Sequence, residues 1–178
     1  MTSKYIIPFL TSSNLACFLS PAIGQEMARS QITFSCEDIQ STPITVAKNK
    51  EGVTKTIFYW KQEALQNKTI KTPKEHCDYA VQQLNDSKIE ENDDIIRFLA
   101  TQVSVVPVIC LAIDNPNNCS KVISIFAPAQ DTIPNTIAYE ILKAILNPEI
   151  IVNKTDSYKY RDCCHTMSWK INLFQSKE

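Results

Sequence analysis

Two apolar runs rich in β-branched residues stand close together between Val105 and Ala127. They flank a polar cluster, Asp114–Asn118, whose residues favour tight turns. This arrangement predicts a β-hairpin. The first arm, Val105–Ile113, is almost continuously apolar instead of alternating, which is typical of a central strand covered on both faces.

Three shorter segments with strand-like patterns precede this hairpin. They are Ile32–Cys36, Thr42–Ala47 and Thr54–Lys61, the last of which is rich in β-branched and aromatic residues. Short polar turns separate them, one of them at Asn49–Gly52. Three strands joined by short turns predict an antiparallel meander.

The segment that begins at Thr72 predicts a helix. Thr72 can cap the helix, Pro73 fits its first turn, and the carboxylate of Glu75 can reach back to the cap amide. Apolar residues then follow at helical spacing: Cys77, Ala80, Val81 and Leu84. We expect the helix to end at Asn85–Ser87, with Cys77 directed toward the core.

A second helix is predicted from Thr132 or Ile133, with Pro134 in its first turn. It ends before Asn147-Pro148. Its apolar face comprises Ile137, Ile141, Leu142 and Ile145.

Two further segments have strand-like patterns. Asp93–Ala100 fits either a strand or a short helix, and we favour a strand that precedes the hairpin. Trp169–Phe174 predicts an additional strand at the edge of the sheet.

These elements predict the α+β class: a single domain in which an antiparallel sheet of about five to six strands is flanked by two helices. A chain of 178 residues is long enough for one domain with a substantial core. We expect a leader over residues 1–25, the α+β domain over residues 26–148, and a C-terminal extension over residues 149–178.

The leader differs from the rest of the chain. Lys4 is the only charge before Glu26, and the apolar runs Tyr5–Leu10 and Leu15–Leu19 are followed by small residues at Ala22–Gly24. This outline is that of a secretory signal peptide, and the alternative is a buried N-terminal element. No later run approaches the roughly 20 apolar residues of a transmembrane helix. We therefore expect a soluble mature protein, with at most a peripheral association with a membrane.

Composition excludes several classes of function. Hydrophobic residues make up 44% of the chain, charged residues 21%, and the net charge is −1, which gives no reason to expect a nucleic-acid partner. The chain has only two glycines, Gly24 and Gly52. Glycine-rich phosphate loops of the Walker or dinucleotide-binding kind are therefore excluded.

Of seven cysteines, Cys17 lies in the leader, and six remain. An exported domain favours disulfides, although the residues alone do not choose among many pairings. We favour Cys110 with Cys119, because one stands on each arm of the hairpin, and then Cys36 with Cys77. The adjacent pair Cys163-Cys164 is left over. Because a bond between neighbours is strained, these two cysteines stay reduced, pair separately, or exchange with each other.

The order of several short motifs resembles the circadian oscillating protein (COP) family of cyanobacteria. The motifs are FSC at Phe34, STPITVAK at Ser41, a strand containing Trp60, TPKEHC at Thr72, PVIC at Pro107, and a further cysteine before VISIF. The resemblance covers Phe34 to Leu146, and the family is generally exported or membrane-associated, with no assigned biochemical activity. This chain departs from it at Ser104–Val106, where the family tends to have an asparagine-glycine turn. It also has His76 where an arginine is usual.

The residues also suggest two alternative functions: a thiol-dependent or metal-binding enzyme, and a module that binds a small ligand. Cys163, Cys164 and His165, with His76 and Cys77, could hold zinc, or a thiol could act as a nucleophile beside a histidine. Trp60, with Phe58 and Tyr59, could instead line a cleft for a small ligand, although packing of alternate members of this run in the core is the simpler interpretation.

From the residues and the resemblance we expect an exported, disulfide-stabilised protein of the periplasm, the cell surface or another extracytoplasmic compartment. We expect it to be an envelope-associated interaction module and not an enzyme, with no cofactor and no metal. Its partner would be an unidentified protein or another component of the envelope.

Overall fold

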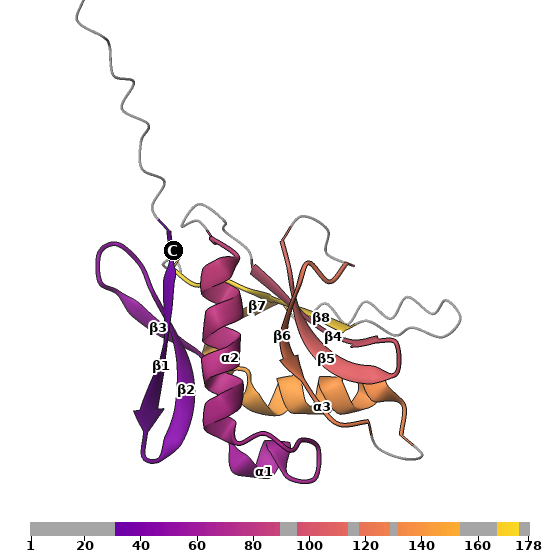
Figure 1. Cartoon of the computed structure of the whole chain (residues 1–178). Coiled ribbons are helices and arrows are strands. Elements are labelled where there is room, and N and C mark those ends of the chain that lie inside the picture. The colour runs from indigo at the N-terminus through magenta and orange to yellow at the C-terminus, as the bar shows by residue number, and fades with distance from the viewer. Residues whose placement is uncertain (1–30, 90–95, 114–117, 129–131, 154–166, 175–178) are drawn as a thin grey trace, which may run out of the picture.

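The computed structural model describes residues 31–89, 96–113, 118–128, 132–153 and 167–174 (Figure 1). The leader, Cys17 and the segment Cys163–His165 lie outside these ranges. In chain order the elements are β1 (Thr33–Ile39), β2 (Thr42–Lys48), β3 (Thr54–Tyr59), α1 (Gln62–Leu65), α2 (Pro73–Asp86), β4 (Ile96–Val103), β5 (Val106–Ala112), β6 (Lys121–Ile125), α3 (Pro134–Ile145), the 3-10 helix η1 (Pro148–Ile150), β7 (Ile151–Asn153) and β8 (Met167–Ile171).

The fold is of the α+β class, as the sequence predicts, but its strands are divided between two antiparallel sheets instead of one. One sheet has the strand order β1-β2-β3, and the other has the order β6-β5-β4-β8-β7. Helix α2 lies between the sheets, because it contacts β1 and β2 of the first and β6 of the second (Figure 1). Helix α3 packs against β4 and β5.

The smaller sheet is the predicted meander. β1 pairs with β2 and β2 with β3, both antiparallel. A bulge interrupts the second pairing, since Thr45 pairs with Phe58 while the next residue, Val46, pairs with Thr56. Ile57 is the extra residue, and consequently both Ile57 and Phe58 are buried in consecutive positions.

The hairpin around residues 114–117 is confirmed, since β5 and β6 pair antiparallel on either side of it. Residues 107–112 of β5 are all buried, as expected of a strand covered on both faces. The middle position of the larger sheet nevertheless belongs to β4 and not to β5. β4 is the strand that we favoured for the segment ending at Ala100; residues 93–95 of that segment lie outside the described residues.

Both long helices begin where the sequence predicts. At the start of α2 the Thr72 side chain accepts a hydrogen bond from the amide of Glu75, and the Glu75 carboxylate accepts one from the amide of Thr72. These two bonds satisfy amides that the first turn of a helix leaves unpaired. Helix α3 starts at Pro134 and buries its predicted apolar face, formed by Ile137, Ile141, Leu142 and Ile145. No helix among the described residues is long and apolar enough to cross a membrane.

The C-terminal segment corrects the prediction of an edge strand. The strand predicted over Trp169–Phe174 is β8, which spans Met167–Ile171, ends before Asn172 and lies between β4 and β7. Trp169 and Ile171 of this strand are buried in the main core. The short strand β7, which no sequence pattern indicated, occupies the edge instead.

Two disulfides link these elements, and both are pairings that the sequence favours. Cys36 of β1 is bonded to Cys77 of α2, with 5.8 Å between their Cα atoms. Cys110 of β5 is bonded to Cys119, just before β6, with 5.3 Å between Cα atoms. The first bond ties the small sheet to α2, and the second closes the hairpin of the large sheet.

Candidate functional site

Trp60 does not face a ligand: its side chain is 0% exposed. Its indole Nε1–H donates to the Thr45 hydroxyl at 2.9 Å, and its ring packs 5.4 Å from the ring of Phe58. A buried indole with its one donor satisfied is a core residue. The proposed role of Trp60 in a cleft is therefore wrong.

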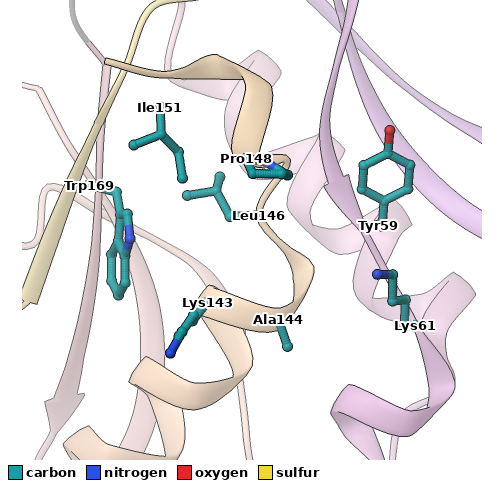
Figure 2. A pocket seen from close by; sticks show the side chains of 8 residues that line it. All are labelled: Tyr59, Lys61, Lys143, Ala144, Leu146, Pro148, Ile151 and Trp169. Atoms are coloured by element: carbon teal, nitrogen blue, oxygen red, sulfur yellow. The ribbon is translucent and has the colours of Figure 1, made fainter. Parts of the chain in front are cut away.

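The residues on either side of Trp60 do line a cleft. Side chains alternate between the two faces of an extended segment, so Tyr59 and Lys61 point away from the core that Trp60 enters. The cleft has a volume of about 420 Å³ and lies where β3, the end of α3, η1, β7 and β8 meet. Its lining consists of Tyr59, Lys61, Lys143, Ala144, Leu146, Pro148, Ile151 and Trp169 (Figure 2).

Backbone pairing holds the two sides of this cleft together. Phe58 and Leu146 form an isolated antiparallel bridge. The buried Asn147 extends it, because its amide donates to the carbonyl of Ile57 at 2.8 Å and its side chain donates to that of Thr56 at 2.9 Å. The end of α3 is thereby fixed to β3, and a cleft fixed by backbone hydrogen bonds is largely preformed.

The floor of the cleft is apolar and its rim is open. Leu146 and Trp169 are buried, whereas Lys61, Lys143 and Ala144 are exposed. The ring of Trp169 is held in place by stacking on Tyr139 of α3, with 5.2 Å between ring centroids. Figure 2 shows Trp169 and Ile151 on one side and Tyr59 and Lys61 on the other, with the end of α3 between them.

Among the described residues, the lining has two titratable cations, both lysines, and no carboxylate. Lys61 Nζ lies 5.9 Å from the ring centroid of Tyr59. The salt bridges within the described part of the chain use other lysines, namely Lys68, Lys74 and Lys121. The rim therefore carries positive charge that these ion pairs do not neutralise.

A second notable group is His76, which is 1% exposed at the first turn of α2. Its ring is stacked between Trp60 and Phe126, with centroids 5.6 and 5.3 Å away. Nδ1 lies 2.7 Å from the Ser124 hydroxyl and Nε2 lies 2.9 Å from the Thr69 hydroxyl. A hydroxyl can donate or accept, so these partners satisfy either tautomer of the neutral ring.

Burial lowers the pKa of His76 to about 4, because the charged imidazolium loses its hydration there. Nearby Lys71 lowers the pKa further, and Glu75 opposes the shift. His76 is thus neutral at physiological pH.

A serine beside a histidine is one component of nucleophilic catalysis, but this pair lacks the others. Ser124 and His76 are both buried, and the second ring nitrogen meets a threonine hydroxyl where a catalytic histidine would meet an orienting carboxylate. Cys77, the other residue of the proposed zinc set in this region, is bonded to Cys36. Among the described residues there is also no group of three or more histidine, cysteine, aspartate or glutamate side chains placed to hold a metal.

Comparison with known proteins gives no match: no family model, no curated protein and no solved structure is similar to this chain.

Sequence reasoning missed the burial of His76 and most of the cleft, for different reasons. His76 stands four residues before Ala80 and eight before Leu84, so its place on the buried face of α2 could have been found from helical spacing. Of the aromatic run that we expected to line a cleft, Tyr59 does so. The rest of the lining comes from residues 61 to 169, which are brought together by long-range pairings that no local pattern specifies.

Proposed function

We propose that this chain is an exported, disulfide-stabilised protein without enzymatic activity that acts as an interaction module in an extracytoplasmic compartment. Its partner would be a protein or another component of the cell envelope. The resemblance to the COP family supports the same location.

The observation that carries this proposal is the pair of disulfides. Cys36–Cys77 and Cys110–Cys119 each join separate elements, and in each pair one cysteine is fully buried. Disulfides that staple a core persist in oxidising compartments and are rare in a reducing cytosol. The leader-like composition of residues 1–25 agrees with export.

The side chains of the cleft and of the His76 site, as far as the structure describes them, support the proposal that the protein is not an enzyme. The cleft is lined by apolar side chains, a tyrosine and two lysines, with no histidine, cysteine, serine or carboxylate. His76 is closed off from solvent and has both ring nitrogens occupied. General acid-base catalysis most often uses a histidine or a carboxylate, and the described lining of the cleft has neither.

The proposal is tested by expressing the full chain in a bacterial host, separating the cell fractions, and sequencing the N-terminus of the recovered protein. We expect an exported form that lacks residues 1–25. Peptide mapping by mass spectrometry without reduction should then recover one peptide pair linking Cys36 to Cys77 and another linking Cys110 to Cys119.

Recovery of an uncleaved protein with all its thiols free from the cytosol would overturn the proposal. The competing thiol or metal enzyme, which would use Cys163, Cys164 and His165, predicts different results. It requires rapid alkylation of one low-pKa thiol by a limiting amount of iodoacetamide, or one equivalent of metal in the purified protein by elemental analysis.

A further inference from the structure

We propose that the cleft between β3, the end of α3 and β8 binds a small amphipathic anion, with an apolar body against Trp169 and Leu146 and an acidic group at Lys61 or Lys143. This site does not rest on the proposed location of the protein, because its described lining contains no cysteine.

The size of the cleft sets the first limit on the ligand. A volume of about 420 Å³ lies within the range of small-molecule sites and is too small for a folded partner. The end of α3 is fixed to β3 by hydrogen bonds of 2.8 and 2.9 Å from Asn147. The cavity therefore exists before a ligand arrives, which reduces the entropy lost on binding.

The apolar floor sets the second limit. Leu146 and Trp169 are buried beneath the opening, and Ile151, Pro148 and Tyr59 continue the apolar wall. Transfer of an alkyl or aromatic body from water to such a surface is favourable in proportion to the apolar area covered. A strongly hydrated ligand without such a body, for example acetate, gains little here.

The lysines at the rim set the third limit, because they favour a ligand that carries a negative charge. Lys61, which follows β3, and Lys143, on the end of α3, are both exposed at the opening (Figure 2). The ion pairs within the described residues involve other lysines. The acidic residues nearest the two lysines along the chain do not line the cleft: Glu63 is exposed on α1, Glu140 pairs with Lys68, and Glu149 is exposed on η1. A carboxylate can gain a charge-assisted hydrogen bond at this rim, whereas a cationic ligand meets repulsion.

The test uses the full disulfide-bonded protein and octanoate as the probe, with two matched compounds. Octylammonium has the same chain and the opposite charge, and acetate has the acid group without the chain. Binding is followed by the indole N–H signals of Trp169 and Trp60 in proton-nitrogen correlation spectra, assigned by the Trp169→Phe variant. We expect octanoate to shift the Trp169 signal saturably and to leave that of the buried Trp60 unchanged.

Variants separate the contributions of charge and shape. Lys61→Gln combined with Lys143→Gln should weaken octanoate binding about tenfold, the effect of losing a charge-assisted contact. Lys48→Gln combined with Lys74→Gln removes the same charge from residues outside the cleft and should change the affinity less than about twofold. Ala144→Phe, at an exposed helical position, should block the opening while leaving the melting temperature unchanged.

Four results would overturn the site. They are equal binding of octylammonium, a shift that grows without saturating, a response confined to Trp60, and equal affinities for the two lysine double variants.

Discussion

At the scale of the residue, His76 is a buried titratable side chain whose two ring nitrogens both have hydrogen-bond partners. A histidine enclosed by two aromatic rings is compatible with the fold because it is neutral and because two hydroxyls satisfy its nitrogens. Protonation inside this site would bury a charge without a carboxylate partner among its hydrogen-bond contacts. The ring therefore links the stability of the protein to pH.

The direction of this link follows from the lowered pKa of His76. An unfolded chain takes up a proton at His76 near pH 6.5, whereas the folded protein does so only near pH 4. The contribution of neutral His76 to the free energy of unfolding is therefore fully present above pH 6.5. It is lost as the pH falls toward 4, and the loss totals about 3 kcal/mol. We expect urea denaturation at a series of pH values to show this loss.

The variant His76→Gln provides the control, because glutamine keeps a polar side chain that does not titrate. Its free energy of unfolding should fall less steeply between pH 6.5 and pH 4 than that of the wild type. Direct titration of the His76 ring protons by nuclear magnetic resonance is the second measurement. A midpoint near 6.5 in the folded protein would contradict the predicted linkage.

The pattern of residues around Trp60 also explains why the sequence did not show that this side chain is buried instead of facing a cleft. An aromatic run such as Phe58-Tyr59-Trp60 gives no indication of which member faces outward until the register is known. The bulge at Ile57 settles the matter, because it sets Phe58 and Trp60 inward and leaves Tyr59 at the cleft.

At the scale of the element, α2 is the piece that links the two sheets. It contacts β1 and β2 on one side and β6 on the other, and the Cys36–Cys77 bond fastens it to β1. The residues joined by this bond are 41 positions apart, against 9 for Cys110 and Cys119. The longer loop restricts the unfolded chain more.

Removal of the two disulfides should therefore have unequal effects. In the loop-entropy model, Cys36→Ala with Cys77→Ala lowers the free energy of unfolding by about 4 kcal/mol, and Cys110→Ala with Cys119→Ala lowers it by about 2.5 kcal/mol. Chemical denaturation of both double variants beside the wild type measures the difference. A larger loss for the hairpin disulfide would show that loop closure does not dominate.

Elements with strong local patterns were the ones that sequence reasoning identified. The cap at Thr72, the proline at Pro134 and the turn residues near Asn115 each act over a few positions, and the two long helices and the hairpin follow from them. β7 carries no such pattern, because three residues are too few to establish a period.

At the scale of the whole molecule, the larger sheet depends on a strand from the far end of the chain. β8 pairs with β4 on one side and β7 on the other, and it buries Ile171 and Trp169. Nothing local to Trp169–Phe174 specifies these neighbours, and nothing local divides the strands between two sheets. The sequence therefore predicted the class of the fold but not the grouping of its strands.

The contribution of β8 can be measured with a matched pair of substitutions. Ile171→Ala should lower the free energy of unfolding by about 2–4 kcal/mol, because it leaves a cavity in the core. Val152→Ala on the paired strand β7 should change it by less than about 0.5 kcal/mol, because Val152 is 52% exposed. Comparable effects in thermal denaturation would mean that β8 is peripheral to the core.

The position of β8 inside the larger sheet also affects the order in which the sheets can form during synthesis. The ribosome makes β8 after every other described strand. Until then, the backbone hydrogen-bonding groups on one edge of β4 lack their partner strand. The meander and α2 can assemble early, because their contacts are close along the chain. The larger sheet cannot be completed before β8 is made, and until then the free edge of β4 is open to pairing with other strands.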